Sequence, residues 1–268
     1  MERDPAVGGS DYGRDDLRDL GDEPPGTLRD TAPDVLAPID ASSPVSGHMP
    51  PPEHTGSIAD TPEHDWSAAS AILFPLLRPT GTQGMAAAGI DAVALAADTV
   101  RHHAQPIVDE GPCDLAVVYA MPGTGFDVII NVDHLISWGT TVEAIQDAAL
   151  GNLAAWSAGA PWTDEVSGER RLISSDTGDG WDAARILLPE VRERLVAELG
   201  GAGRVLIGLP ERHLLIAGAL RPDDDEFAAL FAEFVVEHSG GADEPVDRRV
   251  FELVDGQLVE FGGLPAPA

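Results

Sequence analysis

Lysine is absent from the 268 residues, and all 16 basic residues are arginine. The chain has 46 Asp and Glu, so its formal net charge is −30. Nucleic-acid backbones and anionic membrane surfaces need clustered positive charge, and we expect neither as the main partner. The missing lysine also excludes a phosphate-binding loop of the G-x-x-x-x-G-K-[ST] type and Schiff-base chemistry on a lysine.

Cysteine is nearly absent too, because Cys113 stands alone. One cysteine excludes an intramolecular disulfide and a cysteine-rich zinc site. Nothing basic adjoins Cys113, so we interpret it as a small apolar residue rather than a reactive thiol. No apolar run reaches the roughly 18 residues of a membrane span, and the acidic start Met1 to Asp4 is unlike a secretory signal. We therefore expect a cytoplasmic protein, and the excess of Ala, Gly, Pro, Asp and Arg is typical of a high-GC bacterial genome.

The first quarter of the chain has a composition of its own. Residues 1–65 contain 15 acidic residues, four arginines, ten prolines and one aromatic residue, Tyr12. Their apolar residues follow no period, so this segment cannot bury enough apolar surface to offset its chain entropy. We predict a disordered, acidic, Pro/Gly-rich tail over residues 1–65, a folded core over 66–262 and a loose C-terminus over 263–268.

The core shows strong helix and strand patterns. Helices are predicted over Trp66 to Leu77, Met85 to Val100, Thr140 to Trp156 and onward from Pro222, although Val93 and Leu95 also fit a strand. Asp179 starts another helix, and Pro189 either kinks it or begins a fresh helix that runs to Leu199. Strands are predicted over Leu115 to Met121, Phe126 to Val132, Arg170 to Ser174, Arg204 to Leu209, Leu214 to Ala219, Val250 to Val254 and Leu258 to Phe261. Thr140 with Glu143 fits a capping box, and the helix after Pro222 would bury Phe227, Leu230, Phe231 and Phe234.

Hairpins that alternate with amphipathic helices predict an α+β fold with a mostly antiparallel sheet. The core has room for two subdomains, divided near residues 160–178. A doubly wound nucleotide fold is not expected, because the glycine-rich segment Gly200 to Gly203 follows a helix and precedes a strand. A dinucleotide loop needs the opposite order.

Common catalytic motifs, H-E-x-x-H and G-x-S-x-G, are missing. A polar loop from Ser174 to Gly180 contains Asp176 and Asp179, and with His213 in a turn these are weak candidates for catalysis. The loop resembles a cation-binding loop but lacks the spacing and closing Glu of an EF-hand. Capping of the next helix by Asp179 explains it more simply.

Asp133 and His134 are weak candidates for metal binding, and we favour a capping or hydrogen-bonding role for His134. No resident metal and no cofactor is expected. Trp162 is a candidate for an exposed anchor that contacts a partner.

Five segments in fixed order carry a family resemblance. They are Leu115 to Tyr119, Val132 to Leu135, Ala148 to Leu153, Trp181 to Leu188 and Val205 to Ile216. In this order they resemble the DUF1444 (YtpQ-like) family of bacterial proteins, over about residues 66 to 261. Its most specific parts are the Ala-Leu-x-Asn-Leu helix and the Pro-x-Arg turn. That turn usually ends in Asp in the family, whereas this chain has His213, so a role of that Asp does not carry over.

Two residues stand out under this resemblance. Asn152 could contact a ligand, but a buried amide that specifies packing is favoured. Arg212 could anchor a carboxylate of a partner or of the chain itself, and internal pairing is favoured in so acidic a chain. The family implies no activity.

Two functional hypotheses follow. The first is a non-enzymatic module that binds another protein, since no catalytic constellation stands out. The second is a hydrolase or a small-ligand or metal-binding enzyme that uses Asp176, Asp179 and His213 or His134.

Overall fold

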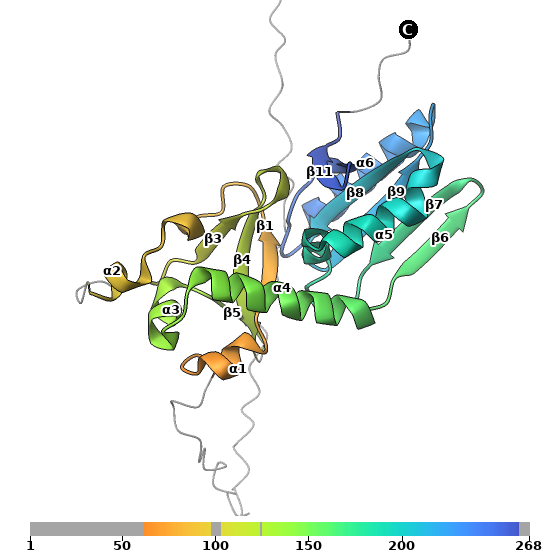
Figure 1. Cartoon of the computed structure of the whole chain (residues 1–268). Helices are drawn as coiled ribbons and strands as arrows, with labels where there is room; N and C mark the ends of the chain where they lie inside the picture. The colour runs from red at the N-terminus through yellow and green to blue at the C-terminus, as the bar shows by residue number, and fades with distance from the viewer. Residues whose placement is uncertain (1–61, 98–102, 124, 263–268) are drawn as a thin grey trace, which may run out of the picture. The chain divides into compact units, whose positions relative to one another are not determined.

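The computed structural model describes residues 62–97, 103–123 and 125–262. Within these ranges the chain forms helices and two sheets, of five and six strands, and all strand pairs but β2–β3 are antiparallel (Figure 1). The predicted α+β class is confirmed. The tail predicted for residues 1–65 lies outside the described residues except for its last four, and so does the end predicted for 263–268.

The first sheet has the strand order β1-β4-β3-β2, and β5 also pairs with β4. Its strands are β1 (Phe74–Arg78), β2 (Met85–Ala86), β3 (Ile107–Glu110), β4 (Ala116–Pro122) and β5 (Asp127–Ile129). Its helices are α1 (Trp66–Ser70), η2 (Ala87–Gly89), α2 (Ala92–Ala96), η3 (Pro112–Asp114), α3 (Val132–Trp138) and α4 (Val142–Gly159). Strand β4 is buried along six of its seven residues, as its run of β-branched and apolar residues predicts. The predicted hairpin β4–β5 is confirmed.

The helix predicted over Trp66 to Leu77 is wrong beyond Ser70, because β1 replaces its second half. Pro75 lacks the N–H that a continuing helix would use. It is tolerated in β1 because β1 lies at the edge of the sheet, where Leu76 and Leu77 are buried. The helix predicted from Met85 shrinks to α2, which starts where the Asp91 side chain accepts hydrogen bonds from two backbone N–H groups. Residues 98–100 of that prediction lie outside the described residues.

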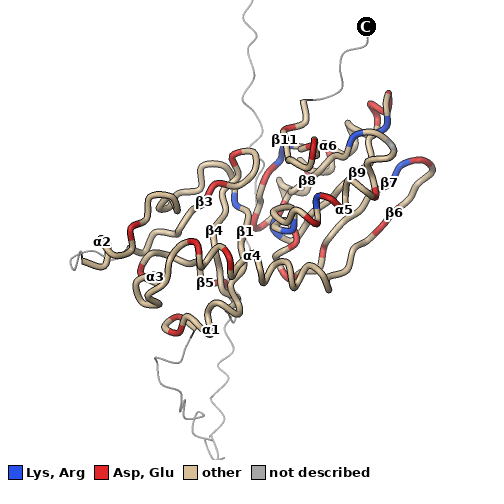
Figure 2. The backbone as a smooth tube through the Cα atoms, viewed as in Figure 1, with Lys and Arg blue, Asp and Glu red and all other residues tan. Residues whose placement is uncertain are grey.

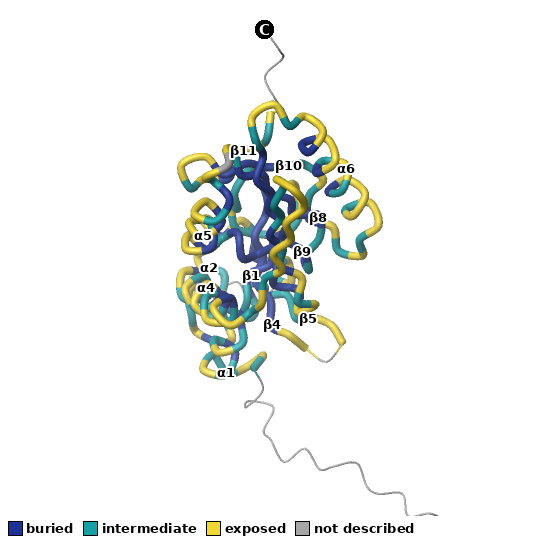
Figure 3. The backbone as a smooth tube through the Cα atoms, turned by 90° about the vertical axis from the view of Figure 1, so that its right-hand side faces the viewer, coloured by how far each residue is buried: buried dark blue, intermediate teal, exposed yellow. Residues whose placement is uncertain are grey.

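The second sheet has the order β11-β10-β8-β9-β7-β6. Its strands are β6 (Thr163–Ser167), β7 (Arg170–Ser175), β8 (Arg204–Glu211), β9 (Leu214–Leu220), β10 (Val250–Val254) and β11 (Gln257–Glu260). Its helices are η4 (Ala183–Leu187), α5 (Pro189–Leu199), η5 (Gly200–Ala202) and α6 (Asp225–Gly241). Helices α5 and α6 cover opposite faces (Figures 1 and 3). The predicted hairpins β8–β9 and β10–β11 are confirmed.

Three predicted helix starts need correction. Thr141, not Thr140, caps α4 and accepts a hydrogen bond from the Ala144 N–H. Helix α6 begins at Asp225, because Asp223 has a φ of 63°, outside the helical region. Asp179 caps no helix: the helix that follows it is the 3-10 helix η4, preceded by Asp182. A short helix, α3, also begins at Val132, where the strand predicted from Phe126 was to end.

One hydrophobic cluster includes residues of both sheets, and a second lies under α6. The possible division into subdomains near residues 160–178 falls where the chain passes from α4 to the second sheet. Leu153 of α4 and Ile173 of β7 nevertheless belong to the same hydrophobic cluster. None of the described helices has the length and hydropathy needed to cross a membrane.

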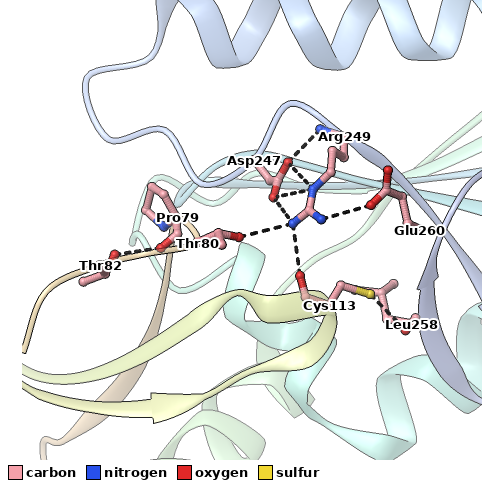
Figure 4. A network of polar contacts seen from close by, with 8 residues as sticks. All are labelled: Pro79, Thr80, Thr82, Cys113, Asp247, Arg249, Leu258 and Glu260. Atoms are coloured by element: carbon pink, nitrogen blue, oxygen red, sulfur yellow. Dashed lines mark hydrogen bonds and ion pairs between the residues drawn. The ribbon is translucent and has the colours of Figure 1, made fainter. Parts of the chain in front are cut away.

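A polar network around Arg249 joins the two sheets (Figure 4). Its guanidinium donates to the carboxylates of Asp247 and Glu260, to the Thr80 hydroxyl and to the Cys113 carbonyl, at 2.7–3.3 Å. The Cys113 thiol donates to the Leu258 carbonyl at 3.1 Å, and burial raises its pKa. Cys113 therefore forms hydrogen bonds between the two sheets, in addition to the role of a small apolar residue that the sequence predicts.

Candidate functional site

A groove of about 890 Å³ lies between helix α6 and the outer strands β7 and β6. We call it the α6 groove. Its apolar lining comprises Val166, Leu172, Leu214 and Ile216 of the sheet and Phe227, Leu230, Phe231 and Phe234 of α6. Figure 3 views the protein from the side of β6 and β7, with the exposed positions in yellow. All five residues of β6 are exposed.

The start of α6 is fixed to strand β7 by charge. The Asp224 carboxylate accepts the Phe227 N–H at the helix N-terminus. It also accepts two hydrogen bonds from the Arg170 guanidinium, at 2.7 and 3.1 Å. These bonds hold the pKa of Asp224 below its usual range. A bidentate arginine–carboxylate pair sets orientation as well as distance, so it aligns α6 beside β7.

Two strand glycines let α6 approach the sheet closely. A Cβ on Gly218 would lie 2.8 Å from the Phe227 ring, and one on Gly208 would lie 2.5 Å from Val235. Real Cβ atoms do not approach so closely, so any larger residue would push the helix outward. Glycines within a strand often mark such a close approach, which is a signal that sequence reasoning missed here.

The apolar stripe of α6 is wider than the face that it buries. Phe227, Phe231 and Val235 are buried, whereas Leu230 is 49% exposed and Phe234 is half-buried. The prediction that Leu230 belongs to the buried face is therefore wrong. Helix α6 packs mainly on β8, β9 and β10, so its side toward β7 and β6 stays open.

One end of the groove is acidic. A second hollow of about 620 Å³, the acidic pocket, shares Glu211 and His238 with the α6 groove. Its further lining includes His213, Glu237, Asp243, Glu244 and the end of α6 at Gly241. Glu244 forms ion pairs with Arg78 and Arg212. Among the described residues, Glu211, Glu237 and Asp243 have no ion-pair partner.

Among the described residues, no hydrogen bond or ion pair links the three predicted catalytic candidates to one another. Asp176 is exposed and lines the α6 groove, and His213 lines the acidic pocket with a buried Nδ1 that has no hydrogen-bond partner among the described residues. The Asp179 carboxylate accepts the Trp156 indole N–H at 3.0 Å.

The other predicted contact residues have partners within the chain. The Asn152 amide donates to the carbonyls of Ser70 and Leu73, both at 2.8 Å, which ties α4 to the start of β1. The Trp162 ring stacks on the buried guanidinium of Arg185, whose Cζ atom lies 3.8 Å from the centre of the ring. Because the ring is half-buried there, packing already accounts for much of its surface.

Asp133 and His134 serve the first sheet. The Asp133 carboxylate accepts the His103 N–H at 2.9 Å. His134 forms a capping box, in which its Nδ1 accepts the Asn131 N–H and its own N–H donates to the Asn131 side chain. Burial lowers the pKa of His134, against the opposing effect of Glu63 and Asp133. The capping role favoured for His134 is confirmed. Within the described ranges no three His, Cys, Asp or Glu side chains gather to hold a metal ion.

No family model matches the chain, and neither the curated proteins nor the solved structures contain a match. The resemblance to the DUF1444 family stays a prediction.

Proposed function

We propose that this protein is a non-enzymatic interaction module, and that it binds a helix of a partner protein in the α6 groove. The observation that carries the proposal is the surplus of apolar surface on α6. Leu230, half exposed, and Phe234 face two strands that α6 leaves open. Exposed apolar surface beside a polar rim is a common feature of protein-binding sites.

The dimensions of the open face suit one helix. Neighbouring strands lie about 4.8 Å apart, so β7 and β6 present a strip roughly 10 Å wide. A helix with its side chains is about 10 Å across and packs 8–10 Å from a neighbouring helix. A partner helix beside α6 would cover the rest of this face and bury Leu230.

An extended peptide added to the edge of β6 is the main alternative within the same function. β6 pairs on one side only, with β7. A peptide bound along this edge would leave Leu230 uncovered, because that side chain belongs to α6 and not to the sheet edge. We therefore favour the helix, and the position of the contact distinguishes the two.

A labelled amphipathic peptide of about 18 residues, with leucines on one face and arginines on the other, serves as the probe. Fluorescence anisotropy with the full chain measures its affinity. We expect Leu230→Ala to weaken binding by about tenfold, the loss of roughly 1.4 kcal/mol of apolar contact. Val236→Ala is the matched control, since Val236 is 50% exposed on the same helix but outside the groove lining. Equal affinities of the two variants would contradict the proposal.

A further inference from the structure

The α6 groove and the acidic pocket carry negative charge that the chain leaves uncompensated. Glu165, Asp176 and Glu211 line the groove, and Glu237 and Asp243 line the pocket. None of the five has an ion-pair partner among the described residues. Arg170 is the one arginine in either lining, and Asp224 and Glu226 already neutralise it at 2.7 Å each.

From this we propose that the helix bound in the α6 groove is basic and places an arginine or lysine side chain in the acidic pocket. The inference rests on the proposed function and specifies its partner. The apolar face of the partner helix would cover Leu230. A cationic side chain at one end of that helix would reach Glu211, Glu237 and Asp243.

The end of α6 strengthens this assignment. Gly241 closes α6, and it lines the acidic pocket together with Ala242. The C-terminus of a helix carries about half a negative charge from its aligned peptide dipoles. In a helix of 17 residues, this field adds to that of the carboxylates and favours a cation.

Arginines elsewhere in the protein are already engaged. Eight of the eleven described arginines form ion pairs with carboxylates of the same chain. Apart from Arg78, the described arginines all lie from residue 170 onward (Figure 2). Because so few cations remain, the surface has little means to attract an acidic partner, whereas a basic one finds carboxylates to pair with.

Charge also argues against the two occupants that this chain could supply. A second copy has the same net charge of −30 and would bring its own α6 acids against Glu237. The segment 1–61 is long enough to reach the groove, but it has 13 acidic residues against four arginines. Both would place like charges together, which costs free energy at an interface.

Three peptides with the same leucine face test the inference on the full chain. Their polar positions carry arginine, glutamine or glutamate. We expect the arginine peptide to bind at least about tenfold more tightly than the glutamine peptide at low salt, and the gap to shrink at about 0.5 M salt. The glutamate peptide should bind most weakly.

Charge-neutralising variants locate the contact. The double variant Glu237→Gln/Asp243→Asn should weaken binding of the arginine peptide by about fivefold and leave the affinity for the glutamine peptide unchanged. Both side chains are exposed, so the variant should fold normally. Glu193→Gln on α5, exposed on the opposite face of the sheet, is the matched control and should change neither affinity.

The outcomes separate the two proposals. If the glutamine peptide binds as tightly as the arginine peptide and both depend on Leu230, the interaction module stands and the basic partner is overturned. If no peptide binds, the proposed function itself fails. A photo-reactive benzoylphenylalanine at position 230 should crosslink to the arginine peptide. Crosslinking to residues 1–61 or to a second copy instead would overturn the inference.

Discussion

The guanidinium of Arg212, in the turn between β8 and β9, contacts the carboxylate of Asp127 in β5 at 2.6 Å and so joins the second sheet to the first. A second ion pair runs from Arg212 to Glu244, also at 2.6 Å. Burial alone would raise the pKa of Glu244, but Arg212 and Arg78 lower it below its usual range. The internal pairing expected of Arg212 is confirmed, while a contact with a partner stays a prediction.

Arg212→Gln should destabilise the protein by about 3 kcal/mol, because it leaves Asp127 and Glu244 partly buried without a full counter-charge. The free energy of unfolding from urea titrations measures this. Arg221→Gln is the control, since the ion pair of Arg221 with Glu169 is exposed and should contribute less than about 1 kcal/mol. Similar losses in both variants would show that Arg212 is no more than a surface contact.

Gly180→Ala should cost more than Gly178→Ala. Both glycines have a positive φ, 84° and 79°, so both substitutions strain the backbone by about 1 kcal/mol. Only at Gly180 would the new Cβ meet a side chain, at 2.4 Å from Arg212 Nη2. A double-mutant cycle with Arg212→Gln checks the cause. The extra cost should fall when Arg212 is gone, and strictly additive losses would refute the clash.

His134→Gln should make stability less sensitive to acid. Burial lowers the folded-state pKa of His134 below its usual 6.5, so the unfolded chain binds the proton more readily. The stability that His134 contributes is then present above about pH 6.5 and is lost as the pH falls. Glutamine keeps an acceptor for the capping box without titrating. Urea titrations at about pH 7.5 and pH 5.5 should show a smaller loss in the variant. An equal loss would contradict the assignment.

Ser175→Ala should lower the stability of the protein, because the Ser175 hydroxyl links two buried charged groups. The Ser175 hydroxyl donates to Asp182 at 2.5 Å and accepts from Arg185 at 2.7 Å, and all three residues are almost fully buried. Burial lowers the pKa of Arg185 to about 10. Losing the bridge leaves two charged groups short of a partner, at a cost of about 2–3 kcal/mol. Ser70→Ala, which removes one exposed bond, is the control. A loss no larger than this control would mean that Arg185 and Asp182 need no bridge.

Strands with continuous apolar runs were predictable from the sequence. The segments that became β4, β8 and β9 are rich in apolar residues and bounded by turn residues, and local pattern alone identifies such strands. Strand β1 was not predictable in this way. Its residues also fit a helix face, and only pairing with β4, some 40 residues later, decides between the two.

The groove was beyond sequence reasoning for a related reason. The spacing of Phe227, Leu230, Phe231 and Phe234 indicates one apolar helix face, but not how much of that face the sheet covers. Arg212 stood out through the family resemblance, and internal pairing was favoured because the chain is so acidic. Asp127 and Glu244 come from distant parts of the sequence, so only the fold reveals them as partners.

Hydrogen–deuterium exchange of the full chain with the arginine peptide is the strongest test of whether the α6 groove binds a basic helix. We predict that saturating peptide slows exchange in residues 163–176 and 225–244, where the groove and the acidic pocket lie. Helix α5, on the opposite face, should exchange as before. Slowed exchange confined to other segments, or no slowed exchange at a concentration that saturates binding, would rule out the α6 groove as the binding site.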